Sequence, residues 1–258
     1  MRKRTLQIFT LLALTCATAF GGGTGGFGLT VLVDDNPRDQ YFHDGTRYVE
    51  ALRGASYSLR LTNPTPYRVA VALSVDGLNT INAQHTDPRS AAKWVLGPYE
   101  TAVISGWQVN DRTARAFYFT GERNSYRAAL GQTDNLGVIE AVFFRERRPR
   151  MSTYSPHRRD ALGEAGAAPP TASAAPRSEA EKSDGLSDEY AGTGMGHRER
   201  HEVESVDIDL EPEPAASVRI RYEFRPQLVK LGVLQSLTSP LERRERARGF
   251  SAYCPEPK

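Results

Sequence analysis

The stretch "SYSLRLTNPTPYRVAVALSVDG", residues 56–77, decides the fold class. Apolar and polar side chains alternate from Tyr57 to Leu61 and again from Val69 to Val75. A period of two is the pattern of a β-strand with one buried face. The two prolines between the runs cannot donate a hydrogen bond to a sheet. We therefore predict two strands that pair as a hairpin across this break.

The same pattern continues along the chain. Further short strands are predicted at residues 93–96, 101–107, 114–120 and 138–144. The last run is almost wholly apolar, which is typical of a central strand covered on both faces. Asp76-Gly77 suits the positive φ of a tight turn. Because no helical stripe of ten residues interrupts these runs, residues 29–146 are predicted to form an antiparallel β-sandwich of immunoglobulin-like type.

Composition changes after this region. Residues 147–190 are rich in Ala, Pro, Gly and Ser, so they are predicted to be a disordered linker. Alternation returns in "VESVDIDLE" and "SVRIRYEF", and residues 191–234 are expected to complete the sandwich, since a two-stranded hairpin alone is marginal in water. In the tail, residues 235–258, Ser239 and Gly249 can begin and end a short helix.

The first residues resemble a targeting segment. Residues 1–19 combine three basic residues, an apolar run and the ending Ala-Thr-Ala, which predicts a secretory signal peptide and a periplasmic or extracellular protein. The apolar run is too short to be a comfortable membrane span. An alternative is a lipid anchor on Cys16.

The glycine-rich leader, residues 20–28, contains the letters G-x-G-x-x-G from Gly21 to Gly26. A dinucleotide site needs a strand before the glycines and a helix after them. Here a signal peptide precedes them and a strand follows, so no nucleotide site and no cofactor are predicted.

Charge gives little reason to expect nucleic acid as a partner. Without the three basic residues of the signal peptide, 30 Lys and Arg face 31 Asp and Glu. Nucleic-acid binding depends on a basic surface that releases counterions from phosphate. The charge is segregated, however, with a basic stretch at residues 145–159 and an acidic one at 179–189, so the linker is an alternative docking arm for a partner.

Several segments occur in an order that resembles an uncharacterised family of exported bacterial β-rich proteins. They are "SVDGLN" (74–79), "GW" (106–107), "SY" (125–126), "GVIEAVFF" (137–144), "GTGMG" (192–196) and "IRYEFRPQLVKLGV" (220–233). The resemblance implies export and joint folding of the two halves. The family has no assigned activity, so no catalytic residue is transferred. The chain departs from it at residues 81–94, where a glycine-rich loop is expected.

Asp76, Asn79 and Trp107 are candidates for a recognition patch at one end of the sandwich, because loops on rigid β scaffolds often carry function. The alternative is that the first two shape a turn and the tryptophan packs inside. The second glycine cluster, "GTGMG", is predicted to be a bend that enters a strand at Val203.

Three weaker patterns bear on chemistry. His197 and His201 have the i, i+4 spacing of two zinc ligands, although Arg198 stands where a zinc protease needs Glu; the alternative is a solvated loop. Ser90 and Lys93 match S-x-x-K without its companion motifs. "DDNPRD", residues 34–39, lacks the spacing of a calcium loop and is predicted to be a polar turn.

These features favour a non-catalytic, exported structural or binding protein of the bacterial envelope, with an envelope protein as a possible partner. The alternative is an envelope hydrolase or metal-dependent enzyme that uses Ser90 or the pair His197 and His201.

Overall fold

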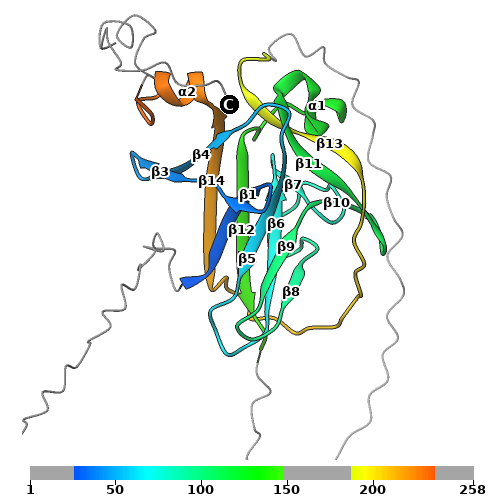
Figure 1. The fold of residues 1–258 in the computed structure, drawn as a ribbon. Coiled ribbons are helices and arrows are strands. Elements are labelled where there is room, and N and C mark those ends of the chain that lie inside the picture. The colour runs from blue at the N-terminus through cyan, green and yellow to red at the C-terminus, as the bar shows by residue number, and fades with distance from the viewer. Residues whose placement is uncertain (1–25, 148–186, 236–258) are drawn as a thin grey trace, which may run out of the picture.

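A computed structural model describes residues 26–147 and 187–235 of the chain. These residues form two packed β-sheets with a few short helical segments at their ends (Figure 1). The prediction of an all-β sandwich is therefore confirmed. No helix in the two described ranges is long and apolar enough to cross a membrane.

The first sheet has the order β10-β11-β5-β1-β2, with β13 also on β11 and β9 also on β5. Its strands are β1 (Gly28–Val33), β2 (Asn36–Pro37), β5 (Ser56–Thr62), β9 (Thr101–Ile104), β10 (Gly106–Asn110), β11 (Thr113–Gly121) and β13 (Ala191–Arg200). Their described pairings are all antiparallel.

The second sheet has the order β3-β4-β14-β12-β6-β7, with β8 also on β6. Its strands are β3 (Gln40–His43), β4 (Thr46–Ala51), β6 (Val69–Val75), β7 (Leu78–Asn79), β8 (Trp94–Leu96), β12 (Val138–Arg145) and β14 (Ala216–Phe224). Here β14 runs parallel to β4, so this sheet is mixed rather than purely antiparallel.

The predicted hairpin between β5 and β6 is wrong, because the two strands lie in opposite sheets. β5 pairs with β1, β9 and β11, whereas β6 pairs with β12, β7 and β8. Both runs bury their apolar face, and the buried Asn63 fixes the crossover by donating hydrogen bonds to the carbonyls of Tyr67 and Gly97, each at 2.7 Å. The connection thus turns the chain from one layer to the other.

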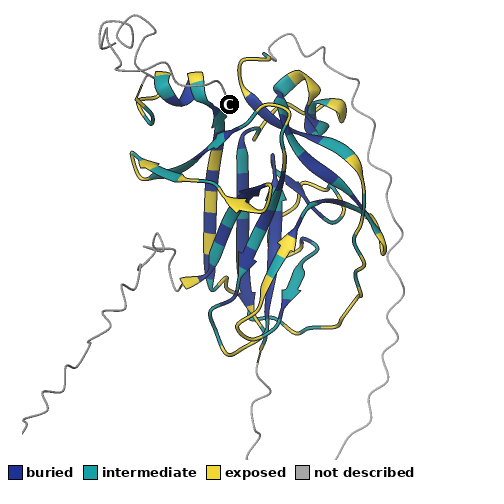
Figure 2. Cartoon of the chain, in the orientation of Figure 1, coloured by how far each residue is buried: buried dark blue, intermediate teal, exposed yellow. Residues whose placement is uncertain are grey.

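Buried residues lie on the strands of both sheets, coloured dark blue in Figure 2, and their side chains form one main hydrophobic cluster. Strand β12 lies between β6 and β14, which confirms its predicted central position. A second, smaller cluster covers the outer face of β12 at Val142 and Phe144, where Ala91 and Leu210 pack on it. Both faces of this end of β12 are therefore buried, as the apolar run predicted.

The segment after the predicted linker differs from the sequence-based expectation. "GTGMG" is part of strand β13 rather than a bend, and residues 203–211 form no strand apart from one bridge between Leu210 and Glu146. Glycine is disfavoured in strands, which hides β13 in the sequence. Here it is needed because a Cβ on Gly194 would lie 2.2 Å from the Tyr118 ring.

Three short helical segments complete the described chain. They are η2 (Glu122–Asn124), α1 (Tyr126–Ala129) and α2 (Arg225–Lys230). The predicted signal peptide, most of the glycine-rich leader and of the linker, and the tail helix at Ser239 lie outside the described residues.

Candidate functional site

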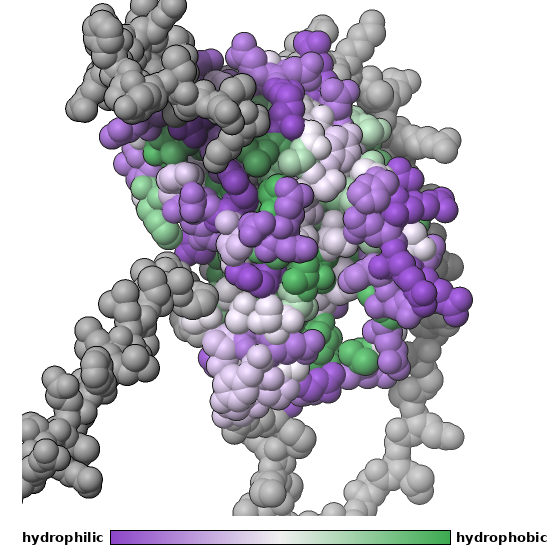
Figure 3. All heavy atoms as spheres, viewed as in Figure 1, coloured by the Kyte–Doolittle hydropathy of each residue, from purple (hydrophilic) through white to green (hydrophobic). Residues whose placement is uncertain are grey.

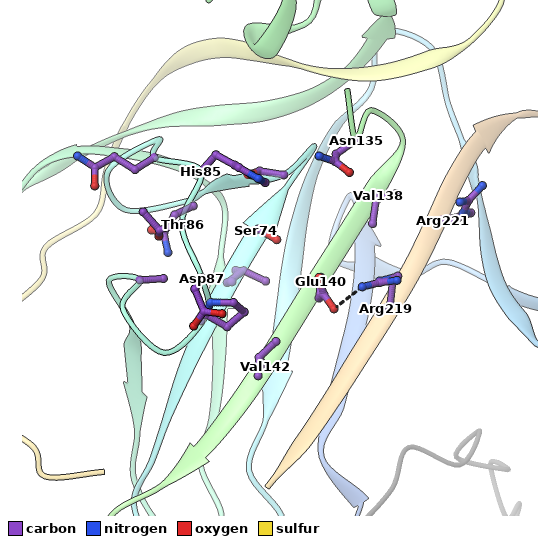
Figure 4. Close-up of a pocket in the computed structure, with 17 residues that line it drawn as sticks. Ser74, His85, Thr86, Asp87, Asn135, Val138, Glu140, Val142, Arg219 and Arg221 are labelled. Carbon is purple, nitrogen blue, oxygen red and sulfur yellow. Dashed lines mark hydrogen bonds and ion pairs between the residues drawn. The ribbon is translucent and has the colours of Figure 1, made fainter. Parts of the chain in front are cut away.

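A groove of about 450 Å³ lies on the outer face of the second sheet (Figure 4). Its floor is made by outward side chains of β6 and β12, and β14 contributes Arg219 and Arg221 along one side. The loop after β7 forms the opposite wall with Gln84, His85, Thr86, Asp87 and Pro88. Polar groups that can donate or accept hydrogen bonds therefore face the groove from both sides.

The alternation of the strands places these polar groups in a row. Glu140 is the register partner of Ser74 on β6 and of Arg219 on β14. Arg219 Nη2 donates to Glu140 Oε1 at 2.9 Å, and Ser217 Oγ donates to the same oxygen at 3.3 Å. One charge-paired row thus crosses three strands beneath the groove.

The loop that forms the wall is held at several points. The buried Asn79 donates from its amide to the carbonyl of Ala92 at 2.8 Å and accepts from the Ile81 N–H at 2.9 Å. His85 Nδ1 lies 2.8 Å from the carbonyl oxygen of Gly77. These bonds connect the ends of the loop to the β6–β7 turn, so the groove is shaped before any ligand enters.

Below the β6–β7 turn, Asp76 is the centre of a buried hydrogen-bond network. Its Oδ1 accepts from Tyr222 Oη at 2.6 Å and from the Gly137 N–H at 2.8 Å, and its Oδ2 accepts from the Thr193 N–H at 2.8 Å. Burial raises the pKa of Asp76 to about 6, although these hydrogen bonds oppose the shift. The carboxylate joins four separate segments of the chain.

The network continues through two hydroxyl groups. Thr193 Oγ1 lies 2.7 Å from Tyr222 Oη and 2.7 Å from Tyr57 Oη. Burial, and then the charge of Asp76, raise the pKa of both tyrosines well above the usual value, so both keep their protons. Tyr222 Oη donates its hydrogen bond to Asp76. Its oxygen therefore accepts from the Thr193 hydroxyl, which in turn accepts from the Tyr57 hydroxyl.

The predicted recognition residues are buried, and of the three only Asn79 is among the residues that line the groove. Asp76, Asn79 and Trp107 are 1%, 4% and 2% exposed. Trp107 packs edge-on against Phe117, at a centroid distance of 5.1 Å, while Asn79 anchors the groove loop. The three side chains therefore do not form an exposed patch, and their roles are those of the alternative interpretation, turn and core.

The two candidate zinc ligands are separated by the extended conformation of β13 and its continuation. His197 pairs with Glu199 at 3.0 Å, whereas His201 Nδ1 contacts Gln108 Oε1 at 2.7 Å. Four residues of strand span roughly 13 Å, too far for two ligands of one ion. Among the described residues there is no cluster of three or more His, Cys, Asp or Glu side chains placed to hold a metal.

Two further motifs are accommodated in turns. Lys93 Nζ donates to the carbonyls of Arg89 and Ala91, and desolvation lowers its pKa. It caps a turn rather than facing the Ser90 hydroxyl. Asp34 and Asp35 adopt φ of 49° and 60° and form a turn, whereas Asn36–Pro37, which were also predicted to be part of a polar turn, form strand β2.

A second groove, of about 600 Å³, lies between β8, β9 and the segment after β13. Its apolar members include Ile81, Trp94, Val103 and Val206. Figure 3 shows hydrophobic side chains beside an opening on this side of a largely hydrophilic face. Its lining also includes the charged residues Arg68, Lys93, Glu100, Glu202 and Glu204.

Comparisons with protein-family models, with curated proteins and with solved structures each found no match. Sequence reasoning missed the groove, although one signal was present: Glu140 interrupts the apolar run of β12, which indicates that part of its outer face meets solvent.

Proposed function

We propose that this protein is a non-catalytic, exported β-sandwich of the bacterial envelope that binds an extended polar segment of a partner protein in the groove over β6, β12 and β14. The groove itself carries the proposal. Its volume of about 450 Å³ falls in the range of ligand sites. Export is supported by the signal-peptide features of residues 1–19.

A polypeptide segment suits the lining better than a purely apolar ligand. Ser74, Gln84 and Asn135 offer hydroxyl and amide groups, which can bond to a peptide backbone. Asp87 on the loop and Arg221 on β14 place opposite charges on the two walls, so the sequence of the bound segment would be discriminated as well.

A binding role is favoured over hydrolysis by the hydrogen bonds of the described histidines. Nucleophilic catalysis needs a Ser, Thr or Cys within reach of a base. The polar contacts of His85 and His201 are with Gly77 and Gln108 instead, and the described residues contain no Ser-His or Thr-His hydrogen bond.

The test is a comparison of two serine variants. Ser74→Arg places a long side chain on the groove floor, whereas Ser58→Arg makes the same change on β5, in the other sheet; both serines are half-buried. Tagged protein lacking residues 1–19 is used to capture partners from an envelope extract. We expect the Ser58→Arg variant to retain the wild-type partner and the Ser74→Arg variant to lose it, with both melting cooperatively. Equal capture by both variants would refute a role for the groove.

A further inference from the structure

Arg127 is a buried cation with unused donors. It lies on α1, is 2% exposed, and donates from Nη2 to Asp134 Oδ1 at 2.7 Å. Its Nε and Nη1 have no hydrogen-bond partner among the described residues. A buried donor without an acceptor is costly, and more so when it belongs to a charged group. The guanidinium thus has capacity for a further acceptor.

The unused Nη1 lies next to one end of the groove, which Gly77 and Asn135 form and which we call its head. A Cβ built on Gly77 would lie 3.2 Å from Arg127 Nη1 and 3.0 Å from Asn135 Cβ. Gly77 and Asn135 both line the groove, and Figure 4 shows Asn135 at its upper end, at about the same height as His85. Asn135 is exposed and its Nδ2 donates to Asp134 Oδ2 at 2.8 Å, so a path from the groove to Nη1 requires this surface side chain to give up that hydrogen bond.

The fixed charges around this point are balanced, because Arg127, Arg219 and Arg221 are matched by Asp134, Glu140 and Asp87, so the unused donors of Arg127 rather than a net positive charge favour an anion. Asp134 is exposed, and the hydrogen bond from Arg127 holds the pKa of its carboxyl below the usual value, with smaller contributions from the positive charges of Arg127 and His85. Further down the groove, Glu140 is paired with Arg219. The exposed Asp87 of the loop is the acidic side chain that opposes an anion from the groove lining.

We propose that the head of the groove is a subsite for a carboxylate of the bound segment, which accepts from Arg127 Nη1 after the Asn135 side chain moves aside. This inference rests on the proposed function and specifies its ligand as an acidic peptide. A guanidinium matches the geometry of a carboxylate well, and charge-assisted hydrogen bonds of this kind are roughly twice as strong as neutral ones.

The experiment monitors the Arg127 Nε–Hε resonance by NMR in the full chain lacking residues 1–19. Two peptides are titrated at constant ionic strength: acetyl-Gly-Glu-Gly-amide, with only a side-chain carboxylate, and acetyl-triglycine, with only a terminal one. The neutral acetyl-Gly-Gln-Gly-amide is the control ligand. We expect a saturable shift with at least one acidic peptide and none with the neutral one, and the responding peptide identifies the source of the carboxylate.

The matched variant is Asn135→Asp, which removes the hydrogen bond from Asn135 Nδ2 to Asp134 Oδ2 and places a second carboxylate of the chain itself at the entrance to Nη1. Asp tolerates the positive φ of 58° at this position, so the fold is retained where removal of Arg127 could disrupt it. We expect the variant to bind the acidic peptide at least tenfold more weakly than the wild type, while Asn124→Asp, an exposed change on η2, has no effect.

No saturable shift in the wild type, which would mean that ordered water alone satisfies Arg127, overturns the subsite, as does equal binding by the Asn135→Asp variant. Failure of the subsite is distinguishable from failure of the groove. If the peptides do not bind but Ser74→Arg still abolishes partner capture, only the carboxylate subsite is wrong.

Discussion

At the scale of single residues, Asp76 both forms a turn and connects segments that are distant in the sequence. Its φ of 50° helps to form the turn after β6, and its carboxylate then holds Thr193 and Tyr222, which are 117 and 146 positions away. Asp is among the residues that tolerate this backbone conformation. The same residue therefore shapes a local turn and connects distant strands.

Asp76 gives the protein a pH dependence of stability with a defined sign. Its folded pKa of about 6 exceeds an unfolded value near 3.9, because the ionised form is buried. Its favourable contribution is therefore fully present below pH of about 4 and is lost as the pH rises through about 6. We expect acidification from pH 7 to pH 4 to raise the unfolding free energy of the wild type, relative to an Asp76→Asn variant, by about 2 kcal/mol.

The measurement is denaturant unfolding of both proteins between pH 7 and pH 4. Glu223, whose pKa burial also raises, and Asp134, whose pKa is lowered, are present in both, so their contributions cancel in the difference. We expect the Asp76→Asn variant to be less stable than the wild type at every pH, because the N–H groups of the new amide would face groups that themselves donate hydrogen bonds. A difference that does not change with pH would show that Asp76 does not titrate in this window.

At the scale of elements, the crossover from β5 to β6 depends on one buried amide. Asn63 donates to two carbonyls and accepts at Oδ1 from the Thr65 N–H at 3.0 Å and from Thr65 Oγ1 at 2.7 Å. We expect Asn63→Ala to lower the unfolding free energy by about 2–3 kcal/mol, because buried groups lose their partners. Asn36→Ala, at the exposed start of β2, should change it by less than about 0.5 kcal/mol. Equal losses in urea unfolding would contradict this role.

The elements also show which parts of the fold were predictable. The runs of β5, β6 and β12 alternate or are apolar throughout, and the positive φ at Asp76 and Gly77 follows from the identity of those residues. The sequence did not predict which strands pair with one another, because an alternating pattern shows only which face of a strand is buried. β5 and β6 lie in different sheets because the chain crosses over between them. In this crossover Asn63 donates to the carbonyl of Gly97, 34 residues further along the chain.

The candidate site was less predictable for a related reason. Ser74, Glu140 and Arg219 are ordinary outward residues on three separate strands, and only the register brings them into one row. Arg127 gave no signal either, since an arginine in a short helix is normally exposed. The order of residue types along the chain does not show which residues of different strands lie side by side. It therefore does not predict a site that is assembled across strands.

At the scale of the whole molecule, the segment after residue 186 is part of both sheets. β13 pairs with β11 along most of its length, and β14 lies between β12 and β4 in the centre of the second sheet. In Figure 1 the two strands, in yellow and orange, lie on opposite layers. Without β14, residues 26–147 would therefore have a gap between β4 and β12 in the second sheet. The apolar side chains that β14 buries would then be exposed.

This arrangement predicts that two fragments should reconstitute the sandwich. Residues 20–147 expressed alone should not unfold cooperatively, because the second sheet lacks its central strand. Co-expressed with residues 187–258, they should co-purify and show a single cooperative transition. Ile220→Asp in the second fragment should prevent association, since this side chain is 0% exposed, whereas the exposed Arg221→Asp on the opposite face of β14 should permit it. A cooperative melting transition of residues 20–147 by themselves would show that the first part folds independently, and that β13 and β14 dock onto a completed domain.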